Sequence, residues 1–142
     1  MSSYDPNNIF AKILRGEVPS HKVYEDEHSL AFLDIMPRTQ GHTLVIPKAP
    51  ARNLLDVPRE ALAHTIVTVQ TVAQAAKVAF KADGITLSQF SESAGGQVVF
   101  HLHFHILPCW TGVAIRPPGG PFQNAEALRP FADKIAAGFA SL

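Results

Sequence analysis

Three of the seven histidines in this 142-residue sequence stand at alternate positions, His101, His103 and His105. The surrounding residues 98–107 are mostly apolar and predict a strand, in which successive side chains point to opposite faces. The three imidazoles would then share one face at a spacing of about 7 Å. The side chains between them would point into the core: Leu102, Phe104 and Ile106. Because imidazole titrates near neutral pH, a neutral ring can attack and a charged ring can donate a proton.

This row of histidines has three possible interpretations. Three core histidines would each need partners for two ring nitrogens, which makes them costly to bury. A zinc site is the second, but alternate positions on a flat strand spread the nitrogens, so only two could share an ion, and the nearby Cys109 is alone. The third, which we favour, is nucleophilic chemistry. At phosphorus, a central imidazole such as His103 splits one displacement into two steps through a phosphoramidate intermediate.

The loop before the histidines fits phosphate chemistry. Residues 91–97 contain Gly95 and Gly96, where backbone N–H groups can approach an anion closely. A Gly-Gly pair alone is more typical of a tight turn between strands. Its place directly upstream of His101 favours a phosphate loop.

The remaining patterns predict one α+β domain over residues 1–142, with a core at 8–110 and a C-terminal loop and helix at 111–142. We expect an antiparallel sheet of about five strands, covered by one long helix, with short helices near both ends. A stripe of apolar residues predicts the long helix, with Asp56 as its N-cap and Pro58 in its first turn. The expected helices are 8–15, 58–80 and 130–139, and the expected strands are 21–25, 29–34, 42–46, 85–90 and 98–107.

Composition narrows the partners and the compartment. Twelve basic and twelve acidic residues give a net charge of zero, which argues against nucleic-acid and anionic-membrane surfaces. Residues 1–8 resemble no secretory signal, no apolar run is long enough to span a membrane, and the lone cysteine implies no disulfide. We therefore expect a cytoplasmic protein.

Several motifs resemble those of one known family. His101-Leu102-His103-Phe104-His105-Ile106-Leu107 matches the histidine-triad (HIT) signature at every position, and Gly96-Gln97 precedes it as in that family. Residues 9–13, 30–35 and 41–48 are similar to its N-terminal helix, its ribose-binding strand and the next strand, which carries a fourth histidine. The resemblance covers roughly residues 8–110 and is nearest to the purine nucleoside phosphoramidase (Hint-like) branch.

The resemblance implies a nucleotide-binding hydrolase that cleaves a P–N or P–O bond at the α-phosphate of a nucleoside 5′-phosphate derivative. His103 would be the nucleophile, and His105 would contact the phosphate or the leaving group and could act as the acid. His101 and His42 would orient His103 and relay its proton. Asp34 would bind the ribose hydroxyls. Five apolar residues would enclose the base, although their pattern alone favours plain core: Ile9, Phe10, Ile13, Phe32 and Ile35.

The resemblance also implies phosphate contacts from Gly96 and Gln97, a purine nucleotide substrate such as an AMP derivative, no cofactor, no metal, and a homodimer paired through the long helix and an edge strand. Some relatives bind zinc through a Cys-x-x-Cys, but those positions hold Asn8 and Ala11 here.

Three departures from the family pattern bear on activity. Val98 stands where many active members have Ser or Thr, Phe90 where many have Asn, and Cys109 where an Arg often follows the Pro. These changes remove expected phosphate contacts, each worth roughly 1.5–3 kcal/mol. Three alternatives therefore stay open: dinucleoside polyphosphate hydrolysis, a catalytically weak AMP- or GMP-binding module, and a metal-binding regulator.

Overall fold

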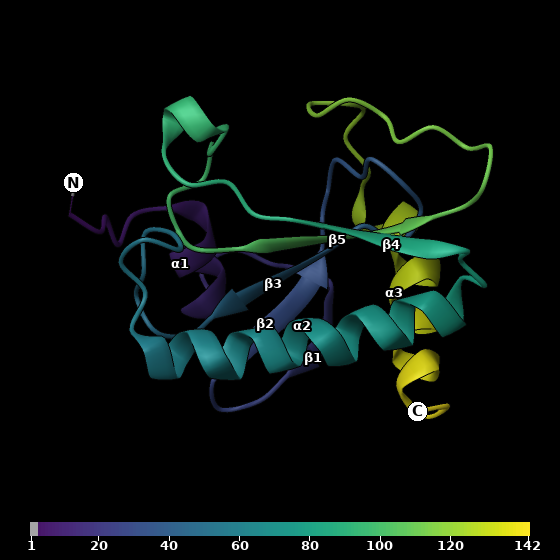
Figure 1. The fold of residues 1–142 in the computed structure, drawn as a ribbon, viewed down its shortest axis with the longest axis horizontal. Helices are drawn as coiled ribbons and strands as arrows, with labels where there is room; N and C mark the ends of the chain where they lie inside the picture. The colour runs from purple at the N-terminus through teal and green to yellow at the C-terminus, as the bar shows by residue number, and fades with distance from the viewer. Residues whose placement is uncertain (1–2) are drawn as a thin grey trace.

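The computed structural model describes residues 3–142 as a five-stranded antiparallel sheet with three helices around it (Figure 1). The strands lie in the order β1-β2-β3-β5-β4, which confirms the predicted α+β architecture. Their bounds are β1 Lys22–Glu25, β2 Ser29–Leu33, β3 Thr43–Pro47, β4 Gly84–Ser88 and β5 Phe104–Cys109, and the helices are α1 Ile9–Leu14, α2 Arg59–Ala79 and α3 Ala125–Phe139.

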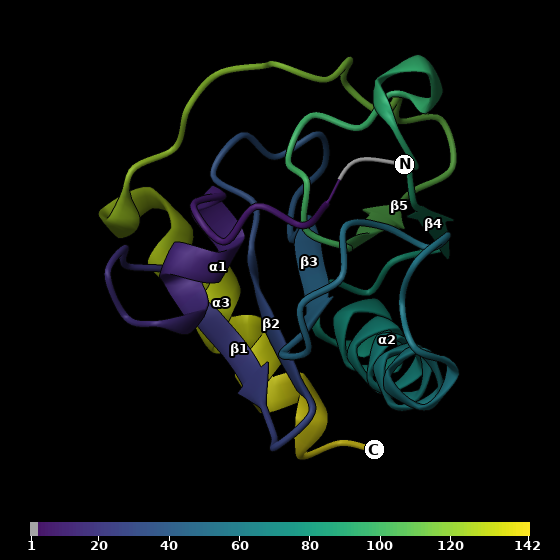
Figure 2. The same cartoon turned by 90° about the vertical axis from the view of Figure 1, so that its left-hand side faces the viewer.

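The inner strands β2 and β3 are buried on both faces, and a different helix packs against each face. On one face α2 lies across the strands, and Val69 and Val72 pack against Val45 and Phe104. On the other face the short α1 packs through Phe10 and Ile13. Figure 2 shows α1 and α2 on opposite sides of the strands. Leu102, Phe104 and Ile106 belong to the α2 side, so the predicted apolar half of the histidine segment does face the long helix.

The C-terminal helix α3 packs against α2. Its Leu128 and Ile135 pack against Ala75 and Ala76 of α2. The two helices approach so closely that a Cβ on Gly138 would lie 2.5 Å from the Ala75 carbonyl oxygen. No helix within residues 3–142 is long and apolar enough to cross a membrane.

The histidine strand is shorter than predicted. The ladder between β3 and β5 ends where Val45 pairs with Phe104, so residues 98–103 lie outside it. Pro47 follows on β3 and has no N–H to continue the ladder. The strand was predicted to end at residue 107 but continues through Pro108, which pairs with Ile85 of β4. Pro108 has no N–H, but the pairing with β3 ends at Ile106, so no hydrogen bond to β3 is lost there.

Two predicted helix starts are wrong. Pro58 is the N-cap of α2, and the carboxylate of Asp56 instead accepts the backbone N–H groups of Arg52 and Asn53. α3 begins at Ala125, with the Asn124 side chain capping its first turn, and Pro130 lies inside the helix. Asn followed by an acidic first turn is a strong start signal, and the prediction gave more weight to proline.

Candidate active site

His101 is fixed by contacts at both of its ring nitrogens. The residue is 0% exposed, and its Nε2 lies 2.9 Å from the carbonyl oxygen of Pro47. Because a carbonyl only accepts, Nε2 carries the proton. Nδ1 therefore accepts the hydroxyl proton of Tyr4, at 2.6 Å. Both ring nitrogens of His101 are therefore hydrogen-bonded within the protein, and neither is available to a ligand.

His103 keeps one nitrogen free. Its Nδ1 donates to the carbonyl oxygen of His101 at 2.7 Å, which leaves Nε2 with an unshared electron pair. Its ring meets the Phe10 ring edge to face at 4.9 Å between centroids, and the side chain is 8% exposed. A neutral imidazole oriented in this way presents a nucleophilic nitrogen.

His42 and His105 form a hydrogen-bonded pair. Nδ1 of His42 accepts the backbone N–H of Arg38 at 3.1 Å, so its Nε2 carries the proton. That Nε2 donates to Nδ1 of His105 at 2.9 Å, and His105 must then carry its own proton on Nε2. With both rings neutral, every nitrogen of the pair has a partner except Nε2 of His105, which presents one N–H donor. The resemblance implied that His42 orients His103, but in the structure its ring bonds to His105.

The neighbourhood keeps all four imidazoles neutral. Burial lowers the pKa of His42 to about 3, and the charges of His105 and Arg38 add to the effect. Burial also lowers the pKa of His101 and of His105 to about 4. The pKa of His103 is lowered by burial too, against the opposing hydrogen bond to the His101 carbonyl.

A glycine sets the position of His42. Gly41 has φ +79°, and a Cβ there would lie 2.3 Å from the Phe80 ring. Only glycine allows both this backbone conformation and this approach. The turn that leads into β3 therefore carries His42 to its place against His105.

Asp34, His42 and His105 place three potential metal ligands within 4.8 Å of one another. The hydrogen bonds oppose a cation at this point. Nδ1 of His42 is committed to accepting the Arg38 N–H, so the Nε2 that faces the other two groups holds a proton and has no lone pair for a metal. The cluster fits a shared proton better than an ion.

Asp34 follows β2 with one carboxylate oxygen engaged and one available. Oδ1 accepts the backbone N–H of Met36 at 2.8 Å, and Oδ2 lies 3.5 Å from Nε2 of His42. Burial raises the pKa of the Asp34 carboxyl, while the Met36 N–H and the charge of Arg38 oppose the rise. The free lone pairs of Oδ2 remain able to accept hydrogen bonds from a ligand.

The residues predicted to enclose a base fall into two groups. Phe10, Ile13 and Phe32 are buried in the cluster beneath α1, as their pattern alone suggested. Ile9 and Ile35 are 43% and 48% exposed. Only these two, with the Phe10 ring edge against His103, offer apolar surface to a ligand.

The glycine loop is satisfied by its own atoms. The Gly96 N–H donates to the Ser93 carbonyl, and the Gln97 N–H donates to Glu92. The Gln97 side chain is buried, and its amide contacts four groups of the loop and its surroundings: Arg52, Asn53, Glu92 and Val99. In this arrangement the N–H groups of Gly96 and Gln97 and the Gln97 side chain already have partners within the protein.

An ion pair braces this loop from outside. The Arg52 guanidinium donates to both carboxylate oxygens of Glu92 at 2.8 and 3.0 Å, and Asn53 donates to the same carboxylate. Glu92 has φ 66° and ψ 162°, a region that non-glycine residues rarely occupy. The brace holds the loop in a strained shape beside the histidines.

The departures from the family pattern have visible consequences. Val98 is 84% exposed and brings no hydroxyl. The Phe90 ring lies 5.6 Å from the His105 ring, between centroids, and it limits the space at Gly96, where a Cβ would lie 3.4 Å from it. The Phe90 ring thus brings apolar surface against His105.

The sequence did not reveal Tyr4 or Arg38 as site residues. Tyr4 lies 97 positions from its partner His101, and no local pattern could connect them. Arg38 stands between Asp34 and His42 in the turn that joins β2 to β3, and a cation in that place was a usable signal. Basic side chains are common in turns, so this signal was weak.

Comparison with known proteins shows which family the chain resembles. The model of the HIT domain family matches residues 15–111. Protein hit of Bacillus subtilis is 48% identical over 103 residues, which cover 72% of this chain and 70% of that protein.

Two solved structures are similar over nearly the whole chain. One is a Hit-like protein involved in cell-cycle regulation from Bartonella henselae, crystallised with an unknown ligand. It is 52% identical with a TM-score of 0.93, over 96% of this chain and 99% of that one. The other is a hypothetical histidine triad nucleotide-binding protein from Sulfolobus tokodaii, 36% identical with a TM-score of 0.86, over 94% and 92%.

Proposed function

This chain belongs to the HIT family, and from that premise we propose that it is a nucleotide hydrolase in which Nε2 of His103 attacks the α-phosphorus of a nucleoside 5′-phosphate derivative. One observation carries the proposal: the bond from Nδ1 of His103 to the His101 carbonyl leaves the electron pair on Nε2. Burial supports it by lowering the pKa of His103, so the ring is neutral at physiological pH.

The reaction balances in two steps. In the first, the Nε2 electron pair forms a P–N bond, the bond from phosphorus to the leaving atom breaks, and its electron pair stays on the leaving atom. An amine leaving group also takes up one proton from solvent. In the second, water attacks phosphorus, the P–N bond breaks, the electron pair returns to Nε2, and one proton returns to solvent.

His105 serves this reaction as a neutral hydrogen-bond donor. With His42 donating to its Nδ1, His105 presents an Nε2–H that can bind a phosphate oxygen or the leaving atom. The pKa of about 4 makes it a poor source of a full proton near pH 7. We therefore assign it charge stabilisation first and acid catalysis second.

The nucleoside would lie along α1 and the end of β2. Oδ2 of Asp34 would accept the ribose hydroxyl protons, and Ile9 and Ile35 would flank the base with their exposed side chains. This apolar surface suits a purine, as in an AMP derivative. The favoured bond is P–N, as in nucleoside phosphoramidates, and dinucleoside polyphosphates are the alternative substrates.

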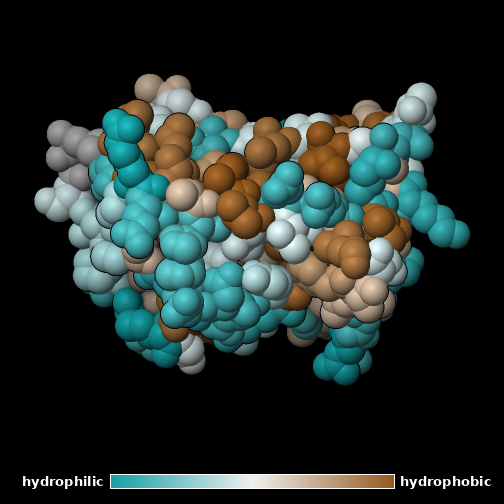
Figure 3. Space-filling model, turned by 60° about the horizontal axis from the view of Figure 1, so that its bottom comes forward, coloured by the Kyte–Doolittle hydropathy of each residue, from teal (hydrophilic) through white to brown (hydrophobic). Residues whose placement is uncertain are grey.

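We also propose a homodimer. β4 is an edge strand of the sheet, and its Leu87 is 47% exposed. The outer side of α2 exposes Ile66, Val67 and Val78, and on the lower face of the molecule apolar side chains gather in a band between hydrophilic ones (Figure 3). A second copy placed on α2 and β4 would cover this surface.

A binding module without turnover is the second candidate function. The closed hydrogen bonds of Gly96 and Gln97 favour it, as does the missing hydroxyl at Val98. Such a module would hold AMP or GMP through Asp34, Ile9 and Ile35 while leaving the phosphate bond intact.

Hydrolysis of adenosine 5′-phosphoramidate decides between the two functions. We expect AMP release by the protein, loss of release in His103→Ala, and unchanged release in His64→Ala, which removes an exposed histidine on α2. If the unchanged protein binds AMP but releases none from the phosphoramidate, the hydrolase proposal is wrong and the binding module takes its place.

A further inference from the structure

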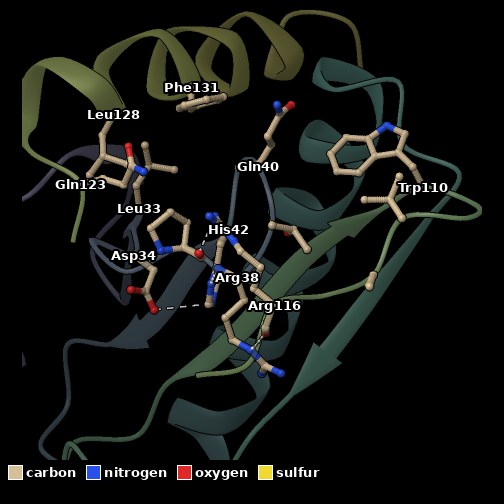
Figure 4. A pocket seen from close by; sticks show the side chains of 15 residues that line it. Leu33, Asp34, Arg38, Gln40, His42, Trp110, Arg116, Gln123, Leu128 and Phe131 are labelled. Carbon is tan, nitrogen blue, oxygen red and sulfur yellow. Dashed lines mark hydrogen bonds and ion pairs between the residues drawn. The ribbon is translucent and has the colours of Figure 1, made fainter. Parts of the chain in front are cut away.

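A cavity of about 560 Å³ lies directly behind His42 (Figure 4). The turn from β2 to β3, the segment 110–123 and the start of α3 enclose it. Asp34 and His42 line it, so the cavity adjoins the histidine pair. Of its lining residues, the proposed placement of ribose and base uses Asp34 alone.

The walls of the cavity combine apolar surface with positive charge. Trp110, Leu128 and Phe131 form an apolar side, and Figure 4 shows Leu128 and Phe131 projecting from α3. Arg38 and Arg116 bring two positive charges to the lining, against the one carboxylate of Asp34. Such a lining favours a ligand that carries negative charge on an apolar body.

Arg38 is held in place without using up its guanidinium. Its Nε donates to the Arg116 carbonyl at 2.8 Å, and in return the Arg116 backbone N–H donates to the Arg38 carbonyl. The Arg116 side chain donates to Pro37. Among residues 3–142, no carboxylate pairs with Arg38 and no acceptor binds its terminal nitrogens. A half-buried cation is thus oriented but not neutralised.

Within residues 3–142, the rest of the site offers the negative charge of a leaving group only the neutral N–H of His105 and no cation. The N–H groups of the glycine loop donate to carbonyls of that loop, and the His42–His105 pair is neutral and has a single outward N–H. The charge of Arg38 does reach this part of the site, since it lowers the pKa of Asp34, His42 and His105.

We propose that this cavity is the leaving-group subsite and that Arg38 is its specificity-determining residue, which favours leaving groups that depart as anions. This inference rests on the proposed function. As the bond from phosphorus to the leaving oxygen breaks, its electron pair stays on that oxygen, and the guanidinium stabilises the charge without supplying a proton. Neutral amine leaving groups gain nothing from Arg38.

The test compares two substrates that share the adenylyl group. Adenosine 5′-phosphosulfate loses an anion, and adenosine 5′-phosphoramidate loses ammonia. We expect Arg38→Gln to lower kcat/KM for the phosphosulfate about 10- to 100-fold, the range for one hydrogen bond to a charged group, and to change the phosphoramidate less than about threefold. Arg38→Lys should restore part of the loss, and Arg59→Gln, an exposed arginine of α2, should change neither. Equal losses on both substrates, or no loss, would overturn the inference and leave the proposed function standing.

A binding experiment separates failure of the inference from failure of the proposed function. Trp110 is the only tryptophan of the chain and lines the cavity, so its fluorescence reports occupancy. If the protein cleaves neither substrate, the hydrolase proposal fails. We still expect ADP to bind about tenfold more tightly than AMP with a change in Trp110 fluorescence, and Arg38→Gln to abolish the difference. Equal affinity for ADP and AMP, or an unchanged fluorescence, would overturn the subsite.

Discussion

The two sides of the segment around His103 come from one alternating stretch of sequence but are stabilised differently. Leu102, Phe104 and Ile106 lie in the core under α2 and need only close packing. On the other side, each imidazole has its nitrogens assigned one by one. A buried polar face is therefore specified by its donors and acceptors, and a catalytic nitrogen is one that the network leaves free.

The largest expected effect comes from the apolar side. Phe104→Ala should lower the free energy of unfolding by about 3–5 kcal/mol, because it removes a buried ring and leaves a cavity under α2. Urea denaturation measures the loss, and Leu55→Ala, at a side chain that is 67% exposed, is the control, with an expected change below about 1 kcal/mol. Similar losses in the two variants would show that the core does not depend on this side of the segment.

Acid should lower the stability of the fold through the buried imidazoles. The pKa values of His42, His101 and His105 are about 3, 4 and 4 in the folded chain, against about 6.5 when unfolded. The unfolded chain therefore binds more protons between these limits, and stability is lost as the pH falls from about 6.5 toward 4. Each histidine contributes up to about 1.4 kcal/mol per pH unit.

Thermal unfolding at pH 7, 6 and 5 measures this dependence. His101→Gln should make the fall in Tm shallower, because it removes one of the groups whose pKa is lowered in the folded chain. A Tm that is flat between pH 7 and pH 5 would mean that the buried histidines are not held neutral.

The smallest expected effect concerns the outer end of the histidine network. Tyr4→Phe removes the hydroxyl that donates to Nδ1 of His101 and should cost about 1 kcal/mol of stability. It should also lower kcat/KM a few-fold, since the His101 carbonyl orients His103.

Tyr24→Phe is the matched control for that change. Its hydroxyl donates to Asp26 in a part of the chain remote from the imidazoles. It should lower stability similarly without changing kcat/KM. If the two variants behave alike in kinetics, Tyr4 does not act through His101.

Much of the fold followed from periodicity, and the failures share one cause. The alternation at 101–106 and the stripe of the long helix predicted which residues face α2, and the order of the elements predicted the sheet. The end of the β3–β5 ladder, the cap of α2 and the start of α3 were wrong, because they depend on which backbone groups find partners. Tertiary contacts, not local patterns, decide those partners.

The candidate site was likewise predicted in part. The sequence and its resemblance indicated the four imidazoles and Asp34, which the structure brings together around His105 and His42. They did not indicate that Gln97 serves the loop, that His42 bonds to His105, or that Arg38 and Tyr4 take part. Each of these is a contact between residues distant in sequence or a choice among several acceptors. The spacing of residues along the sequence reveals neither kind of contact.

Trapping the covalent intermediate tests whether His103 is the nucleophile. The protein is mixed with adenosine 5′-phosphoramidate, quenched in alkali to preserve a P–N bond, digested and analysed by mass spectrometry. We predict an adenylyl adduct on His103 that appears before AMP is released and is absent from His103→Ala. An adduct on His105, or AMP formed in the first turnover without any adduct on histidine, would contradict it.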